Sequence, residues 1–387
     1  MKLYGLLLLL PFLSLTGAHD HHDESQPDAD TLASLKAKWD YDFSFSGIPT
    51  FAHLPYTKCL LAPSVSYDIA IVGAPFDTAV SYRPGARFGP RAIRAASQRQ
   101  TSFRSFNAQQ GINPYLSWAK VLDCGDIPIS PFDNALALQQ MEAAFTELGA
   151  HRSGSGGKPP LLVTLGGDHS IALAALRALK ARDGEAVAVL HFDAHLDTWL
   201  PAKYPSPWPS DQQAFTHGTM FALAHNESLL LPGTSVHAGL RTRLSGTDFG
   251  DYEDDDAQGW YRIEADEIDA PEGVDGVIER ILGRLRGKKV YLSVDIDVLD
   301  PGLAPGTGTP EPGGWTTREL MRILRRVVGE VDVVGVDVVE VAPAYDGVGE
   351  VTALAAAQVV FEVVSGVVKK GVLERKRLQA ERAKDEL

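Results

Sequence analysis

The segment 191–198 constrains the fold of this chain most, because it places potential metal ligands at alternate positions directly after an apolar run. Residues 186–190 read Ala-Val-Ala-Val-Leu, and His-Phe-Asp-Ala-His-Leu-Asp-Thr follows. Alternate residues of an extended segment point the same way, so Asp193, His195 and Asp197 are expected to converge. Burying them together costs much free energy unless they pair or a cation compensates them. The segment predicts a buried strand that ends in a metal site.

Two other segments have the same form. Residues 289–294 are apolar and lead into Asp295 and Asp297, which share one face. Residues 161–165 lead into Gly-Gly-Asp-His-Ser at 166–170, and a helical pattern over 171–180 follows, which predicts His169 at a junction of strand and helix. Ligand sites of open parallel α/β sheets lie beyond the carboxyl ends of the strands. The three segments can therefore meet in one site.

Together these segments offer two imidazoles and four carboxylates. This set is too large for one tetrahedral zinc and suits two hydrated divalent ions. Oxygen-rich ligation with some imidazole favours Mn²⁺. Each segment alone would also fit a surface carboxylate, a helix cap or a satisfied core histidine, but the combination favours a binuclear manganese site.

Seven apolar runs predict strands that alternate mostly with helices. This pattern predicts one α/β unit of three layers, α/β/α, with a mainly parallel sheet covered on both faces. A chain of 387 residues can bury a core of that size. The runs are residues 67–72, 119–122, 161–165, 186–191, 235–240, 289–294 and 331–336.

Residues 166–170, 193–197 and 293–301 resemble the three signature segments of the ureohydrolase family, which contains arginases, agmatinases and guanidinobutyrases. The resemblance spans roughly residues 45–370 and implies an arginase-like fold. It includes five more local strings, at residues 47–51, 83–90, 217–221, 305–310 and 338–346.

The resemblance implies two Mn²⁺ ions per chain, bridged by a hydroxide that attacks the substrate. Asp193 and Asp295 would be the bridging carboxylates. By position, the ligands of one ion would be His169, Asp193, Asp197 and Asp295, and those of the other would be His195, Asp193, Asp295 and Asp297.

Two further residues take roles from the resemblance. Glu340 matches the carboxylate that grips the substrate guanidinium, and a carboxylate can hold that group through two parallel hydrogen bonds. His217 matches a position proposed to shuttle protons, and an imidazole that titrates near neutrality suits this task. Taken without the resemblance, Glu340 would more simply pair with a structural arginine.

The absence of one segment narrows the choice of substrate. Arginases carry a Ser-Gly-Asn-type segment before the histidine loop, whereas residues 209–217 here read Pro-Ser-Asp-Gln-Gln-Ala-Phe-Thr-His. The chain resembles the agmatinase branch, which hydrolyses agmatine to putrescine and urea. A guanidinobutyrase or another guanidino-acid hydrolase stays open, with Arg87 or Arg241 as a possible carboxylate clamp. A catalytically silent paralog that binds guanidines or polyamines is the alternative of another class.

Net charge bears on the partners. A formal charge of −14 disfavours nucleic acid as a partner and suits a small cationic guanidino substrate. The acidic run 248–256 is interpreted as a solvated surface segment. No stable membrane insertion is expected, because the apolar core at the N-terminus is too short to span a bilayer. The resemblance implies a homo-oligomer.

The two ends of the chain predict the secretory pathway. Residues 1–18 resemble a signal peptide, and the chain ends in Lys-Asp-Glu-Leu, the ER-retention tetrapeptide. Residues 19–64 are expected to be an N-terminal extension, 65–372 the ureohydrolase catalytic domain and 373–387 a charged tail. The ER lumen is favoured, with secretion as the alternative, and Asn226 heads a candidate glycosylation sequon.

Only two cysteines are present, Cys59 and Cys124. One disulfide is possible. Because Cys124 lies at the end of a strand that is expected to be buried, a buried thiol is the preferred interpretation.

Overall fold

The computed structural model describes residues 28–203, 208 and 210–385, which fall into two units. In the first, Met1–Phe43, helix α1 (Ala29–Trp39) begins after Asp28, whose side chain accepts a hydrogen bond from the Thr31 amide. The second unit, Ser44–Leu387, contains the sheet. The predicted signal peptide, residues 1–18, and the last two residues of the tetrapeptide lie outside the described residues.

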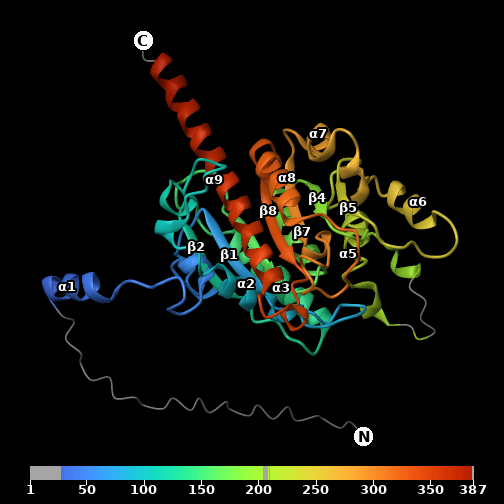
Figure 1. Cartoon of the computed structure of the whole chain (residues 1–387), viewed down its shortest axis with the longest axis horizontal. Helices are drawn as coiled ribbons and strands as arrows, with labels where there is room; N and C mark the ends of the chain where they lie inside the picture. The colour runs from blue at the N-terminus through green and yellow to red at the C-terminus, as the bar shows by residue number, and fades with distance from the viewer. Residues whose placement is uncertain (1–27, 204–207, 209, 386–387) are drawn as a thin grey trace, which may run out of the picture. The chain divides into compact units, whose positions relative to one another are not determined.

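An eight-stranded, entirely parallel sheet forms the centre of the second unit, in the order β2-β1-β3-β8-β7-β4-β5-β6 (Figure 1). The strands are β1 (Ile69–Ala74), β2 (Val121–Asp126), β3 (Leu161–Gly166), β4 (Ala188–Phe192), β5 (Val236–Leu240), β6 (Tyr261–Glu264), β7 (Lys289–Asp295) and β8 (Asp332–Val339). All seven predicted runs form strands. Edge strand β6 was not predicted, because its four residues, Tyr-Arg-Ile-Glu, carry little apolar signal.

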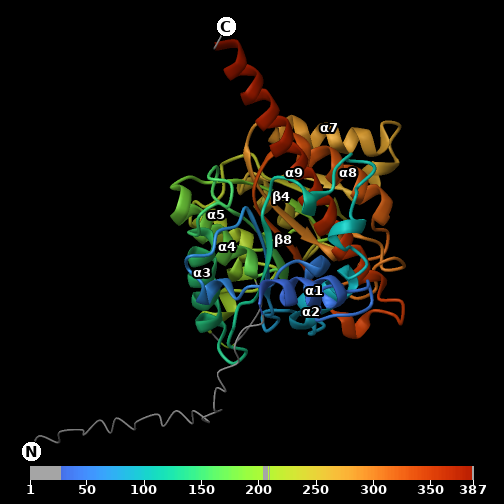
Figure 2. The same cartoon turned by 90° about the vertical axis from the view of Figure 1, so that its left-hand side faces the viewer.

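Two hydrophobic cores flank the sheet. Along β1, Ile69 and Ile71 pack into one core while Ala70 and Val72 pack into the other, as alternation along a strand requires. Different helices cover the two faces (Figure 2). The first core is covered by α2 (Gly89–Ser97), α7 (Gly273–Leu285), α8 (Thr317–Glu330) and α9 (Val351–Asp385), and the second by α3 (Asn134–Gly149), α4 (Ile171–Asp183) and α5 (Met220–Asn226). The predicted three-layer α/β/α architecture is confirmed.

Local signals in the sequence set the ends of these helices. Helix α8 begins with a capping box, in which Thr316 and Glu319 bond to each other's backbone amides. Helix α4 ends at Gly184, whose φ of 70° is a left-handed conformation that glycine adopts without strain.

Helix α9 is the one described helix long and apolar enough to cross a membrane. Its most apolar window is 78% buried inside the protein, which is the pattern of a core helix.

The acidic run 248–256 was interpreted as a solvated segment, but the structure buries two of its carboxylates. Residues Gly250–Ala257 form helix α6, in which Asp251 and Asp255 are 5% and 0% exposed. Residues four apart share a helix face, so both carboxylates point inward. Asp255 is bound there by Arg262, His237 and Thr198, which compensate its burial.

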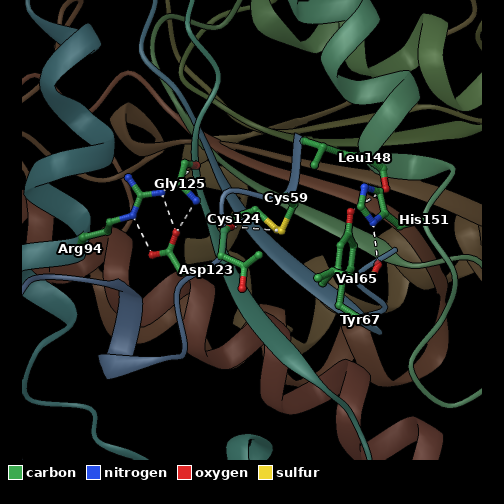
Figure 3. The surroundings of a disulfide bond; sticks show 10 residues. Cys59, Val65, Tyr67, Arg94, Asp123, Cys124, Gly125, Leu148 and His151 are labelled. Carbon is green, nitrogen blue, oxygen red and sulfur yellow. Dashed lines mark hydrogen bonds and ion pairs between the residues drawn. A yellow bond between two sulfur atoms is a disulfide. The ribbon is translucent and has the colours of Figure 1, made fainter. Parts of the chain in front are cut away.

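The preferred interpretation of Cys124 as a buried thiol is wrong, because Cys59 and Cys124 form a disulfide (Figure 3). The chain before Cys59 lies along β2, where the Asp123 amide donates to the Pro55 carbonyl and the Thr57 amide donates to the Asp123 carbonyl, both at 3.0 Å. This pairing brings together two cysteines that are 65 positions apart in the sequence. Sequence patterns carry no signal for such a contact.

We expect the disulfide to stabilise the fold by about 2–4 kcal/mol, because it closes a long loop in the unfolded chain. The double variant Cys59→Ala, Cys124→Ala should unfold at a lower denaturant concentration than the unreduced wild type. Urea unfolding followed by circular dichroism measures this difference. Wild-type protein reduced before unfolding is the matched control and should behave like the variant. Two free thiols in unreduced, denatured wild type would show that the bond does not form.

Candidate metal centre and substrate pocket

The predicted ligands converge at the carboxyl ends of β3, β7 and β4, and β8 lies between β3 and β7 in the sheet. His169 follows β3, and its Nδ1 lies 3.1 Å from Asp193 Oδ2, 3.1 Å from Asp197 Oδ2 and 3.4 Å from Asp295 Oδ2. All four residues are buried. Yet this nitrogen makes no hydrogen bond of acceptable geometry. An orphaned imidazole nitrogen that faces three carboxylates is an arrangement that fits a cation.

A second group of ligands shares Asp193 with the first. His195 Nδ1 lies 3.2 Å from Asp193 Oδ1 and 3.1 Å from Asp297 Oδ2. The six predicted ligand residues are therefore brought together, and Asp193 lies between the two groups, as a bridging ligand must. The structure also adds His191, whose Nε2 lies 2.7 Å from Asp193 Oδ2.

The electrostatics of the cluster are unfavourable without a cation. Burial and the charge of Asp193 raise the pKa of Asp197 to about 6, and burial and neighbouring carboxylates also raise the pKa values of Asp295 and Asp297. Burial opposes protonation of His169, but contacts with Asp193, Asp197 and Asp295 outweigh it and raise its pKa well above the usual value. Divalent cations would replace these protons and relieve the repulsion.

Hydrogen bonds behind His169 orient the orphaned nitrogen. The Ser293 hydroxyl donates to Asp337 Oδ1 at 2.7 Å, and His169 Nε2 lies 2.7 Å from the same hydroxyl oxygen. Because that hydroxyl proton is used on Asp337, the oxygen accepts from His169 Nε2–H. This bond leaves the lone pair of Nδ1 directed at the carboxylates, the arrangement typical of metal-binding histidines.

The backbone is unusual at the same place. A Cβ on Gly167 would lie 2.0 Å from the Phe76 carbonyl oxygen, so only glycine fits before the Asp168-His169 turn. Asp197 and Glu340 have φ values of 54° and 61°, which non-glycine residues rarely adopt. Such conformations concentrate at functional sites, where the surrounding structure holds them.

Glu340 and His217 lie beside the cluster and contact each other. Glu340 is 1% exposed, and its Oε1 accepts from the His169 amide at 2.9 Å and lies 3.1 Å from His217 Nδ1. Its Oε2 is buried and has no hydrogen-bond partner. Burial opposes protonation of His217, but the hydrogen bond and charge of Glu340 raise its pKa to about 9.

A pocket of about 290 Å³ opens over the cluster and His217, a size suited to a small ligand. His195, Asp197, Asp295 and His217 line it. Sequence reasoning missed other lining residues, among them Ser81, Trp199 and Lys203. Ser81 lies two residues before the string at 83–90 and could have been found from it. Nothing in the sequence singles out Lys203.

The two arginines considered as carboxylate clamps are occupied elsewhere. Arg87 pairs with the buried Asp77. Arg241 donates to the carbonyl oxygens of Asp297 and Glu311 at 2.6 and 2.7 Å. Neither lines the pocket in the described part of the chain.

A parallel α/β sheet with a buried cluster of histidines and aspartates at its carboxyl edge fits the class of metal-binding α/β enzymes, and known proteins narrow the class. Residues 67–366 match the model of the arginase family. The chain is 48% identical to putative agmatinase 1 of Schizosaccharomyces pombe, over 88% of this chain and 87% of that protein. It is 37% identical to the guanidinobutyrase of Pseudomonas aeruginosa, over 84% and 95%.

A solved structure agrees with these relatives. The proclavaminate amidinohydrolase of Streptomyces clavuligerus superposes with a TM-score of 0.72 at 35% identity, covering 85% of this chain and 100% of that chain. The chain belongs to the arginase family of ureohydrolases.

Glu340→Gln should lower kcat/KM for a guanidino substrate by about two to three orders of magnitude. The resemblance implies a buried ion pair between Glu340 and the substrate guanidinium. Removing one partner of such a pair costs about 3–5 kcal/mol. Metal content, measured by mass spectrometry, should not change, because Glu340 is not a predicted ligand. Glu362→Gln is the matched control, since Glu362 is equally buried but bonds to Asn107 and Arg325 instead. Wild-type turnover by Glu340→Gln would show that the guanidinium is held elsewhere.

Proposed function

We propose that this protein is a binuclear manganese amidinohydrolase of the agmatinase type, which hydrolyses agmatine to putrescine and urea. One observation carries the proposal. Glu340, whose Oε2 is buried and unpartnered, contacts His169 and His217 beside a cluster of histidines and aspartates that fits cations, and a pocket sized for a small molecule opens at that cluster.

The donor set supports manganese. Four carboxylates and two imidazoles form an oxygen-rich set that suits Mn²⁺ better than zinc. His169, Asp193, Asp197 and Asp295 would hold one ion. His195 and Asp297, together with Asp193 and Asp295, would hold the other. When bound, the two ions would supply the charge that lowers the pKa of water towards neutrality and so provides a nucleophile.

Glu340 would bind and orient the substrate. Its free Oε2, together with Oε1, can accept two parallel hydrogen bonds from a planar guanidinium. Glu340 is buried, so the ion pair would be strong and would direct the guanidinium carbon towards the cluster. The backbone at φ 61° holds the carboxylate in that direction.

His217 would move the proton that the leaving amine needs. Its Nδ1 lies 3.1 Å from Glu340 Oε1, so it adjoins the proposed guanidinium site. The pKa of about 9 reflects the negative charge of Glu340, and a bound guanidinium would offset that charge and lower the pKa towards neutrality. A histidine that titrates near the working pH exchanges protons efficiently.

One residue favours a second candidate. Lys203 lines the pocket and could attract the carboxylate of 4-guanidinobutyrate or another guanidino acid. Its ammonium group already pairs with Asp254, which reduces that attraction. Agmatine therefore stays the first choice.

Purified protein supplied with Mn²⁺ should bind two ions per chain and release urea from agmatine. We expect kcat/KM for agmatine to exceed that for 4-guanidinobutyrate and for arginine, because no arginase-type segment precedes His217 in the sequence and Lys203, the lysine that lines the described part of the pocket, is paired. Metal content and urea release should be measured on the same preparation, with Asp193→Asn as the inactive control.

Each result separates the candidates. A clear preference for 4-guanidinobutyrate that is lost in Lys203→Met would replace agmatine by a guanidino acid. Two bound ions without urea release from any guanidino compound would favour the silent guanidine-binding paralog. A stoichiometry of one or zero in Mn²⁺-replete protein would contradict the binuclear centre.

We also propose residence in the ER lumen, where the signal-like N-terminus and the C-terminal tetrapeptide would act together. The Cys59–Cys124 disulfide supports an oxidising compartment. Asn226 is exposed at the end of α5, so its sequon would be accessible to glycosylation. A homo-oligomer, as the resemblance implies, is proposed as well.

Removal of residues 384–387 should redirect the protein from the ER to the medium without changing its specific activity. Cell fractionation and urea assays on the medium measure both effects. A variant whose last four residues are scrambled is the matched control and should also be secreted. Full-length protein found in the cytosol with residues 1–18 attached would contradict the proposal.

A further inference from the structure

A row of buried polar side chains crosses the sheet one step below the metal cluster. Asp337 of β8 is the register partner of Ser293 of β7, which pairs in turn with His191 of β4. His191 pairs with His237 of β5, and His237 pairs with Arg262 of β6. Apart from Arg262, these residues are 0% exposed. So many polar groups at the centre of a sheet are costly unless they bond to one another.

One half of the row connects the cluster to helix α6. His191 Nε2 lies 2.7 Å from Asp193 Oδ2, and His191 Nδ1 lies 2.7 Å from His237 Nδ1. His237 Nε2 lies 3.1 Å from Asp255 Oδ1. An unbroken chain of three contacts therefore joins the shared carboxylate of the cluster to a buried aspartate that sequence reasoning had placed on the surface.

The directions of these hydrogen bonds follow from the atoms. The carboxylates at the two ends can only accept, so His191 Nε2 and His237 Nε2 both donate. The two Nδ1 atoms face each other at 2.7 Å. At the outer end both oxygens of Asp255 accept hydrogen bonds. An asparagine at position 255 would offer only one accepting oxygen.

The outer end of the chain is held firmly. Asp255 Oδ1 accepts from the Thr198 hydroxyl at 2.7 Å, and Asp255 Oδ2 accepts from Arg262 at 2.8 Å. The ring of Trp260 stacks on that of His237, with centroids 4.0 Å apart and planes 14° apart. With Asp255 and Trp260 both in place, the His237 ring has one orientation, and this orientation dictates that of His191.

We propose that His237 and Asp255 are positioning residues for the metal centre. They hold His191 so that its Nε2–H fixes the Oδ2 side of Asp193, and Asp193 is thereby held in the orientation that both halves of the cluster require. The proposal rests on the metal centre proposed above. Partners behind a metal ligand commonly change metal affinity by about 10- to 100-fold.

Mn²⁺ affinity of the full-length protein tests this proposal, measured by calorimetric titration of the metal-free form. His237→Phe keeps a ring against Trp260 and removes both nitrogens, and Asp255→Asn keeps the size and removes the charge. Each should weaken Mn²⁺ binding by about 10- to 100-fold. The double variant should be no weaker than His237→Phe alone, because both substitutions break the same chain.

If His237 and Asp255 had a purely structural role, their variants would lose thermal stability but keep Mn²⁺ affinity. Glu362→Gln is the control for that case. It removes a buried charge remote from the His191–His237–Asp255 contacts, and it should lower thermal stability while Mn²⁺ affinity stays unchanged. Wild-type Mn²⁺ affinity in folded His237→Phe and Asp255→Asn would overturn the proposal. Wild-type protein that binds no Mn²⁺ would overturn the metal centre and the positioning role together. Normal Mn²⁺ binding by the wild type without urea release would overturn only the proposed reaction.

Discussion

The repulsion among buried carboxylates around His169 is the constraint on which the rest of the site depends. Asp193, Asp197 and Asp295 all approach one imidazole nitrogen to within 3.4 Å, where water cannot screen them. Coulomb interactions are much stronger in such surroundings than in water. The arrangement is stable only with protons or cations between the oxygens, which is why the cluster fits a metal site.

The fold meets this constraint by placing four strand ends side by side. Strands β3, β8, β7 and β4 are neighbours in the sheet although they are far apart in the sequence. Their carboxyl ends deliver His169, Glu340, Asp295 and Asp193 to one edge. Below that edge, Ser293 and Asp337 orient His169, while His191 contacts Asp193. The buried polar row therefore contacts the predicted ligands from inside the sheet.

Much of this arrangement could be predicted because it depends on residues that are close together in the sequence. Apolar runs identified the strands, and the His and Asp residues that follow three of these runs identified the six ligand candidates. These patterns are visible in the sequence because alternate residues of a strand point to the same side. Residues whose importance comes from distant contacts were not predictable. Cys59 contacts Cys124, and Asp255 contacts His237, through the tertiary fold and not through proximity in the sequence. The short edge strand β6 was missed for a related reason, because its pairing with β5 outweighs a weak local preference.

The sequence by itself determined the architecture, the ligand candidates and the family, because strand periodicity and closely spaced motifs are properties of neighbouring residues. Tertiary structure decided which groups face one another. It paired the cysteines, buried Asp255, left Oε2 of Glu340 without a partner and placed Lys203 at the pocket. The physical reason is that burial and hydrogen-bond partnership depend on distances between strands and helices, which side-chain order along the chain does not specify.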